Sequence, residues 1–203
     1  QGAQHSQALH NWFVHVPGLR VVMPSTVSDT RDLLIASVLC PDPVIYIDDR
    51  WLYDQEDELP AVKELDLLDQ KPIISQNGED ITIVASGHSS LLSRDGATLL
   101  QKDGISAEVI DIRVLNPFHV EEIITSVKKT RSLLVVDSGT LTGGFSGEVI
   151  SKIIERLPVG ILKNPPKRIA LPDAPAPSSP VLEKAYYLYP QDVYEAAKKI
   201  LNA

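Results

Sequence analysis

A histidine near the start of this sequence, His5, lies in the tetrapeptide Gln4-His5-Ser6-Gln7, just before a predicted helix. An imidazole can act as an acid or a base near neutral pH, and a helix N-terminus lowers its pKa and favours nearby negative charge. Such a group can stabilise an oxyanion or donate a proton to one. On its residues alone, the tetrapeptide is also compatible with a histidine at the surface or near the helix cap.

Two further segments carry groups that could bind a ligand. The segment Ser86-Gly87-His88-Ser89-Ser90 places a histidine and three hydroxyls at the start of a predicted helix, where hydroxyls can cap free N–H groups. The turn Gly143-Gly144-Phe145-Ser146-Gly147 lies between a predicted strand and a helix, where backbone N–H groups can hold phosphate. It lacks the dinucleotide spacing and the Gly-Lys-Ser/Thr ending. We therefore favour capping for the first segment, and tight strand–helix packing that requires glycine for the second.

The remaining candidate ligands and nucleophiles form no pattern. His10 and His15 are five residues apart, which is a poor spacing for metal ligands on one helix. Neither they nor His119 receive a role, and no metal-ligating residue is assigned. Cys40 is the only cysteine, so it cannot form an internal disulfide and is expected to act as a small apolar side chain. We find no Ser-His-Asp arrangement in a recognisable setting.

The composition limits the class of protein. With 203 residues, 43% of them hydrophobic, the chain can form one large core or two modest ones, and we expect two. A net charge of −8 argues against nucleic acid as the main partner. We find no apolar run that could span a membrane and no signal peptide, and the single cysteine favours a cytoplasmic location. Because the sequence begins at Gln1 without a methionine, we expect it to be part of a longer polypeptide.

The unit that positions these residues is a strand–helix–strand segment between Asp80 and Asn116. Apolar runs at residues 81–85 and 107–112 predict two strands buried on both faces, and the segment between them is helix-like up to Lys102. Asn116-Pro117 predicts the start of the next helix. The elements predicted downstream are a helix at 120–129, a strand at 133–137, a helix from 143 to 157, a strand at 167–171, a proline-rich loop at 172–180 and a helix from Pro190.

The residues upstream of this unit predict a smaller α/β segment. They comprise a helix at 6–16, a strand at 19–23, a helix from Thr26 to about Cys40 and a strand at 44–47. Two strands and two helices cannot enclose their own faces, so this segment is the tail of an open sheet. Residues 48–79 are acidic, and their hydrophobic residues follow neither a helical nor a strand periodicity, which indicates a surface connector. The predicted fold class is α/β with a mostly parallel open sheet, divided into residues 1–47, 48–79 and 80–203.

Several segments, taken in order, carry a family resemblance. They are Gln4–Gln7, Trp12-Phe13, His15–Ser25, Pro43-Val44-Ile45, Gly104–Arg113, Gly143-Gly144-Phe145 and Leu182–Tyr186. Together they resemble the β-subunit of thiamine-diphosphate-dependent 2-oxoacid dehydrogenase E1 components, of the pyruvate, branched-chain and acetoin type. The resemblance extends over nearly the whole chain apart from the connector.

The resemblance implies a domain organisation and a site. Residues 1–47 would complete a transketolase-like pyrimidine-binding domain, and residues 80–203 would form a transketolase C-terminal domain. His5 would be catalytic, in proton transfer or in stabilising the covalent intermediate. The glutamate that activates the aminopyrimidine is expected upstream of Gln1, and thiamine diphosphate and Mg²⁺ are expected to depend on the E1 α-subunit. This chain alone should therefore bind neither and be inactive.

The resemblance also implies partners, and two segments depart from the family pattern. The expected partners are the α-subunit, a second β-subunit in a heterotetramer, and the binding domain of the lipoyl acyltransferase E2. Leu39–Pro43 is about one residue shorter than the family segment that contributes to a structural potassium site, so that metal stays unassigned. Asp49–Tyr53 replaces an acidic-then-aliphatic pattern, which indicates a non-standard substrate. Two other functions remain open: a split transketolase-type enzyme and a non-catalytic assembly or docking module.

Overall fold

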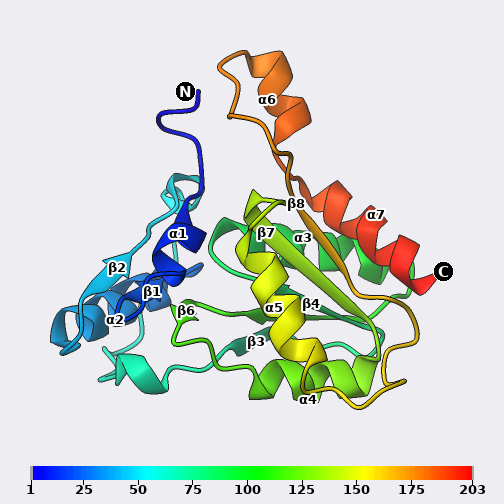
Figure 1. Cartoon of the computed structure of the whole chain (residues 1–203), viewed down its shortest axis with the longest axis horizontal. Coiled ribbons are helices and arrows are strands. Elements are labelled where there is room, and N and C mark those ends of the chain that lie inside the picture. Colours follow the sequence, from blue (N-terminus) through cyan, green and yellow to red (C-terminus); the bar gives the residue numbers. More distant parts are fainter. Residues whose placement is uncertain (1, 203) are drawn as a thin grey trace.

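Five strands form the larger of two sheets, in the order β3-β5-β4-β7-β8. The computed structural model describes residues 2–202, so Gln1 and Ala203, the outer limits of the predicted domains, lie outside the described residues. Adjacent strands are parallel from β5 to β8, whereas β3 runs antiparallel to β5 (Figure 1). The strands are β3 (Ile73–Gln76), β4 (Ile81–Ala85), β5 (Ala107–Asp111), β7 (Leu133–Thr140) and β8 (Lys167–Leu171). The predicted α/β fold with a mostly parallel sheet is confirmed.

Helices cover both faces of this sheet because its strands are apolar on both sides. Ile83 and Val109 pack in one cluster with residues of α3 (His88–Lys102) and α7 (Pro190–Leu201). Their neighbours Val84 and Ile110 point the other way, into a second cluster with residues of α4 (Glu121–Thr130) and α5 (Phe145–Ile154). Successive side chains of a strand alternate between the faces, so a strand between two helix layers must be an unbroken apolar run.

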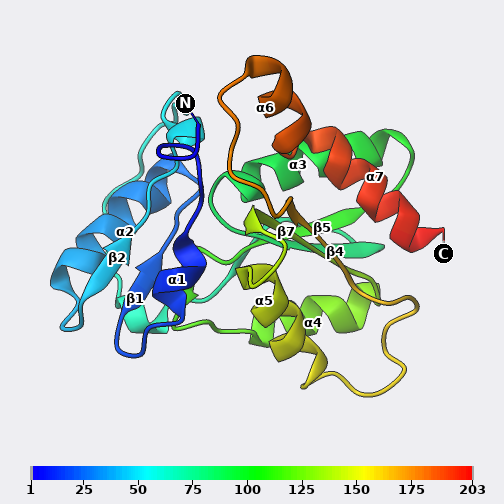
Figure 2. The same cartoon turned by 45° about the horizontal axis from the view of Figure 1, so that its top comes forward.

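The smaller sheet has three strands in the order β2-β1-β6 and lies beside the larger one (Figures 1 and 2). β1 (Arg20–Val22) pairs in parallel with β2 (Val44–Tyr46), and it pairs antiparallel with β6 (Val114–Asn116). The short helix α1 (His10–Val14) and the longer α2 (Val27–Leu39) belong to this unit. The chain therefore leaves the larger sheet after β5 and immediately adds a strand to the smaller one.

This crossing corrects one sequence prediction. Asn116-Pro117 was expected to start a helix, but Asn116 pairs with Val21 as the last residue of β6. Its backbone groups are taken by the sheet, the Asn116–Pro117 peptide bond is cis, and α4 begins only at Glu121. A cap-like dipeptide is a local signal, and here pairing with a distant strand overrides it.

The predicted connector, residues 48–79, contains more structure than its sequence indicated. It holds two short 3₁₀ helices, η1 (Arg50–Leu52) and η2 (Leu67–Asp69), and the whole of β3. Leu67 is buried in the core of the smaller unit. β3 is an edge strand with polar residues at its end, so its sequence lacks the apolar run that identified β4 and β5. The division of the chain at residues 47 and 79 stays a prediction.

Two helices also differ from their predictions. The first was expected from residue 6 to residue 16, but α1 spans only His10–Val14. At the other end of the chain, the proline-rich loop leads into α6 (Pro180–Tyr186), which the apolar pattern did not indicate. Both differences involve the N-terminal segment and α6, and these two segments contact each other.

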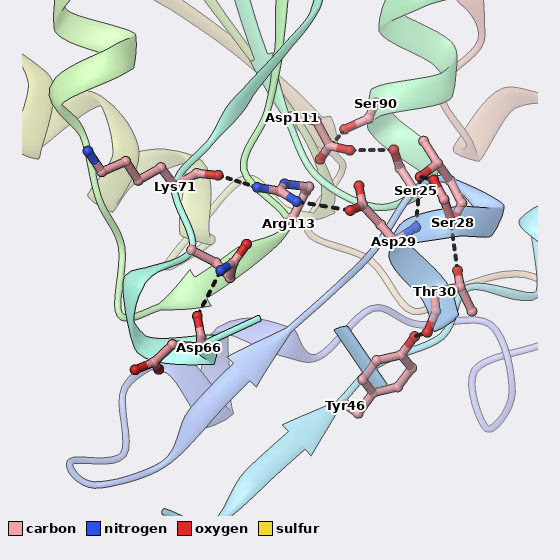
Figure 3. A network of polar contacts seen from close by, with 12 residues as sticks. Ser25, Ser28, Asp29, Thr30, Tyr46, Asp66, Lys71, Ser90, Asp111 and Arg113 are labelled. Carbon is pink, nitrogen blue, oxygen red and sulfur yellow. Dashed lines mark hydrogen bonds and ion pairs between the residues drawn. The ribbon is translucent and has the colours of Figure 1, made fainter. Parts of the chain in front are cut away.

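A buried polar network joins the two units where the chain crosses between them (Figure 3). Arg113, which has a positive φ of 59°, donates from Nη1 to Oδ1 of Asp29 at 2.9 Å and from Nη2 to the carbonyl oxygen of Lys71 at 2.5 Å. Asp111 accepts a hydrogen bond from Ser90 Oγ at 2.9 Å and another from Ser25 Oγ. Thr26 caps α2 through the Asp29 N–H, but the Asp29 carboxylate binds Arg113 and does not complete a capping box.

The Asp111 carboxyl group has no exposed surface, and its burial raises its pKa to about 6. The hydroxyl groups of Ser25 and Ser90 act in the opposite direction, because their hydrogen bonds favour the ionised form. Among the nearby charges, Asp29 raises the pKa of Asp111 and Arg113 lowers it. The cost of burying the Asp111 carboxylate is therefore only partly offset by its two hydrogen bonds and by the charge of Arg113.

We expect Asp111→Asn to flatten the pH dependence of stability between about pH 4 and pH 6. In the unfolded chain an aspartate has a pKa of about 3.9, so in this range the folded state binds the extra proton and stability falls as pH rises. The difference of about two pH units corresponds to roughly 3 kcal/mol, fully expressed above pH 6. Urea unfolding at a series of pH values measures it, with the exposed Asp54→Asn as the control. An unchanged slope in Asp111→Asn would contradict this account.

Candidate functional site

His5 lies in an exposed turn at the start of the chain, well before α1. Its backbone N–H donates to the carbonyl oxygen of Gly2 at 3.3 Å, and Gln7 Nε2 donates to that of Ala3 at 3.0 Å. Because α1 begins only at His10, the expectation that His5 sits at a helix N-terminus is wrong. Its imidazole is open to a ligand, and its catalytic role stays a prediction.

The segment that carries His5 is held from outside by the C-terminal part of the chain. Tyr187, directly after α6, donates from its hydroxyl to the carbonyl oxygen of Ser6 at 3.1 Å. At the other side of His5, Gly2 is buried against the loop before α6. A Cβ atom at Gly2 would lie 2.4 Å from Ser178 Oγ, so the backbone approaches this loop closely.

Three aromatic rings meet beside this segment. Trp51 of η1 stacks on His88, with ring centroids 5.3 Å apart and planes at 21°. The edge of the Tyr187 ring lies against Trp51, with 6.0 Å between centroids. Burial lowers the pKa of His88, against the raising effects of Asp49 and Asp95, so the imidazole is neutral at pH 7 and packs as an aromatic ring. Trp51 still exposes 60% of its surface.

This arrangement corrects the capping interpretation of residues 86–90. No side chain caps α3, whose N-cap residue is Gly87. Ser90 donates to Asp111 in the network between the units, and Ser86 Oγ lies 3.8 Å from Met23 Sδ. His88 stacks on Trp51. Ser86, His88 and Ser90 thus make contacts with distant parts of the chain, whereas the buried Oγ of Ser89 has no hydrogen-bond partner.

In parallel α/β sheets, ligands bind at the carboxyl ends of two neighbouring strands whose connections leave in opposite directions. Here those strands are β4 and β7, and the N-terminal unit fills the crevice between them. His10 is 1% exposed, and its Nε2 lies 3.0 Å from Oδ1 of Asp137, although the ring N–H is poorly aligned with that oxygen. Met23 lies so close to Gly87 that a Cβ atom there would be 2.7 Å from Met23 Cε.

Asp137 also accepts one N–H group of the glycine-rich turn and one from the end of β7. Its Oδ1 accepts from Gly139 N and its Oδ2 from Ser146 N, each at 2.8 Å. Burial acts to raise the pKa of Asp137, but His10 and these two N–H groups together hold that pKa below its usual value. A carboxylate of the chain thus lies where a bound phosphate would accept hydrogen bonds.

The steric interpretation of the turn is confirmed at Gly144. A Cβ atom there would lie 2.1 Å from the carbonyl oxygen of Thr140, which is backbone and cannot move aside. Gly143 differs, because it has a positive φ of 65° and open space around the Cβ position. One glycine is required by close approach, and the other by its backbone conformation.

The other residues considered from the sequence lie apart from one another. His119 Nε2 is 2.9 Å from the carbonyl oxygen of Leu68, His15 is exposed, and Cys40 is half-buried and free. Within residues 2–202, no three histidine, cysteine or acidic side chains are grouped so that they could hold a metal ion. No helix of the described chain is long and apolar enough to cross a membrane.

Sequence reasoning missed the contacts that organise this region. His10 had no recognisable partner, because Asp137 is distant in sequence and carries no motif of its own. The stacking of Trp51 on His88 joins the connector to the start of α3. The only sequence feature that could have indicated this stacking was the pair of aromatic residues within the acidic segment 49–53.

We expect Gly144→Ala to lower the free energy of unfolding by about 3 kcal/mol, because the new methyl group must displace backbone. Gly143→Ala should cost about 1 kcal/mol, the price of a positive φ without steric overlap. Urea unfolding of the two variants compares them directly. A smaller loss for Gly144→Ala than for Gly143→Ala would show that close packing is not what this turn requires.

Comparison with known proteins assigns the chain to a family. Residues 70–193 match the family model "Transketolase, C-terminal domain". The chain is 36% identical over 98% of its length to the pyruvate dehydrogenase E1 component subunit beta of Dictyostelium discoideum, of which the alignment covers 56%. It is 34% identical over 98% of its length to the β-subunit of acetoin:2,6-dichlorophenolindophenol oxidoreductase from Cupriavidus necator, with 59% of that protein covered.

A solved structure agrees in fold. The chain superposes on a split gene transketolase described as an inactive beta4 tetramer, with a TM-score of 0.74, 22% identity, and coverage of 95% of this chain and 60% of that one. The chain spans little more than half the length of the curated relatives it matches. The E1 β-subunit resemblance seen in the sequence is confirmed by these similarities. Because the family model matches more than half of the residues, the chain belongs to the transketolase C-terminal domain family.

Proposed function

We propose that this chain is part of the β-subunit of a thiamine-diphosphate-dependent 2-oxoacid dehydrogenase E1 component. Such an enzyme decarboxylates a 2-oxoacid and transfers the acyl group to the lipoyl group of an E2 protein. The observation that carries the proposal is similarity over 98% of the chain to proteins named as E1 or acetoin oxidoreductase β-subunits. The ordered segments of the sequence, from Gln4–Gln7 to Leu182–Tyr186, support the same family branch.

His5 is the residue of this chain that we propose to act on the substrate. Its side chain is exposed, so a reacting group can reach the imidazole. Near neutral pH, an imidazole can donate a proton to the oxygen of the reacting acyl group or stabilise negative charge on it. His10, the nearest histidine in sequence, is buried against Asp137 and cannot replace it.

We propose that thiamine diphosphate and Mg²⁺ are bound mainly outside this chain. When bound, the thiazolium ring supplies a carbanion and an electron sink for decarboxylation. The glycine-rich turn is a poor fit for the diphosphate, because the buried carboxylate of Asp137 already accepts the Ser146 N–H of the turn, together with the N–H of Gly139 before it. The E1 α-subunit and residues upstream of Gln1 are the proposed sources of the cofactor site, and the isolated chain is then inactive.

The proposed assembly is a heterotetramer of α- and β-subunits that docks E2. The net charge of −8 suits a basic E2 binding domain, and it argues against nucleic acid as a partner. Curated relatives include mitochondrial and bacterial proteins, so the comparison does not indicate one cellular compartment for this chain. A cytoplasmic location stays a prediction.

We expect His5→Gln to lower kcat for 2-oxoacid decarboxylation by roughly 10²- to 10⁴-fold with little change in KM, because the variant loses a proton donor. The assay uses the native protein that carries this chain, assembled with its α-subunit and thiamine diphosphate, and it measures decarboxylation and acylation of lipoyl-E2. His15→Gln, which removes another exposed histidine, is the matched control.

Two outcomes would count against the proposal. Full activity of His5→Gln would remove His5 from the mechanism. Turnover of ketose phosphates without a lipoyl acceptor, and no turnover of 2-oxoacids, would favour a transketolase-type enzyme. Where His5→Gln does lose activity, the matched His15→Gln variant shows whether the loss belongs to the site or to the assembly.

A further inference from the structure

We propose that Tyr187 is a positioning residue for His5, and that the stacked rings of Trp51 and His88 hold Tyr187 in place. The inference rests on the proposed function, because it assigns a support to the residue that acts there. It adds a residue from the far end of the chain to the site.

The segment around His5 needs an external support. Residues 2–9 form turns and bends without a regular helix or strand, and their own hydrogen bonds reach only from Gln7 to Ala3 and from His5 to Gly2. Ordering such a segment costs backbone conformational entropy at every residue. An imidazole that must meet a reacting oxygen within a fraction of an ångström therefore requires contacts from the rest of the protein.

The tyrosine hydroxyl supplies such a contact beside the histidine. Tyr187 Oη donates to the carbonyl oxygen of Ser6 at 3.1 Å, which fixes the peptide unit between Ser6 and Gln7, one unit beyond the peptide that directly follows His5. On the other side of His5, Gly2 is buried, and its backbone approaches the side chain of Ser178 closely. Both contacts come from the segment that contains α6, so this segment sets the position of the histidine between them.

The ring of Tyr187 is itself held by a chain of aromatic contacts. It packs against Trp51 at 6.0 Å between centroids and against the ring of Tyr186 at 5.0 Å, and Trp51 stacks on His88 at 5.3 Å. Aromatic pairs of this geometry are favourable beyond their buried area. His88 is the first residue of α3, which packs on the larger sheet. The contacts thus connect the exposed His5 turn to the rigid sheet through three side chains.

Tyr187→Phe tests the inference, because it removes the hydroxyl and keeps the ring in contact with Trp51. Tyr186→Phe is the matched control: Tyr186 donates to the carbonyl oxygen of Ala174 at 2.9 Å, so both variants lose one bond of the same kind. The assembled native enzyme is used for both. We expect Tyr187→Phe to lower kcat about ten- to a hundredfold with KM changed little, and Tyr186→Phe to leave kcat unchanged.

A second readout does not depend on activity. Millisecond hydrogen exchange, followed by mass spectrometry of the peptide that covers residues 2–9, should be faster in Tyr187→Phe than in the wild type and in Tyr186→Phe. In the double variant with His5→Gln, Tyr187→Phe should cause no further loss of kcat, because the group it positions is gone.

The outcomes separate this inference from the proposed function. If His5→Gln lowers kcat while Tyr187→Phe changes neither kcat nor exchange of residues 2–9, the positioning role is wrong and the proposed function stands. If Tyr187→Phe lowers kcat equally in the presence and absence of His5, the tyrosine acts elsewhere and the inference is overturned. If His5→Gln retains full activity on 2-oxoacids, the proposed role of His5 and the positioning role of Tyr187 both fail, while the assignment as an E1 β-subunit stands.

Discussion

A buried carboxylate, that of Asp111, lies where the two sheets of this protein meet, and the arrangement of both units depends on it. The residue ends β5 of the larger sheet, and its hydroxyl partners come from both units: Ser90 from α3 and Ser25 from the segment before α2. Arg113, two residues on, binds Asp29 at the start of α2. An unpaired buried charge is costly, so the two units must stay together for these groups to be satisfied. The direction in which the chain leaves β5 is fixed by the same contacts.

Docking of the N-terminal unit has a chemical consequence. In an open parallel sheet, the crevice between the carboxyl ends of β4 and β7 is the usual ligand site. Here His10 and Met23 occupy it, and Asp137 accepts the Ser146 N–H of the glycine-rich turn. The larger unit therefore serves as a support. Its potential ligand position has become an interface, and the exposed candidate residue, His5, precedes the buried His10 in the chain by five residues.

Much of the fold could be predicted from the sequence because its signals are local. The apolar runs at 81–85 and 107–112 and the helical spacing after Pro190 identify elements whose type is decided by their own residues. β3 and β6 could not be identified in this way, since an edge strand and a three-residue strand are defined by their partners. The same limit applies to the site. His5 was identified through a family pattern, whereas the hydrogen bond that holds its neighbour Ser6 to Tyr187 joins residues 181 positions apart.

The aromatic contacts around Trp51 show how an acidic connector can still take part in a site. Most of residues 48–69 lie at the surface, as expected for solvated acidic residues. Trp51 lies among them with 60% of its surface exposed, yet one face of its indole ring stacks on the neutral imidazole of His88. A neutral ring stacks without bringing charge into a half-buried position, and burial keeps it neutral by lowering the pKa of His88. The indole also lies against the ring of Tyr187, whose hydroxyl donates to the carbonyl oxygen of Ser6 in the His5 segment. The connector thereby links the helix layer of the larger unit to the candidate catalytic turn, and this explains why a bulky aromatic residue stands in a segment that is otherwise solvated.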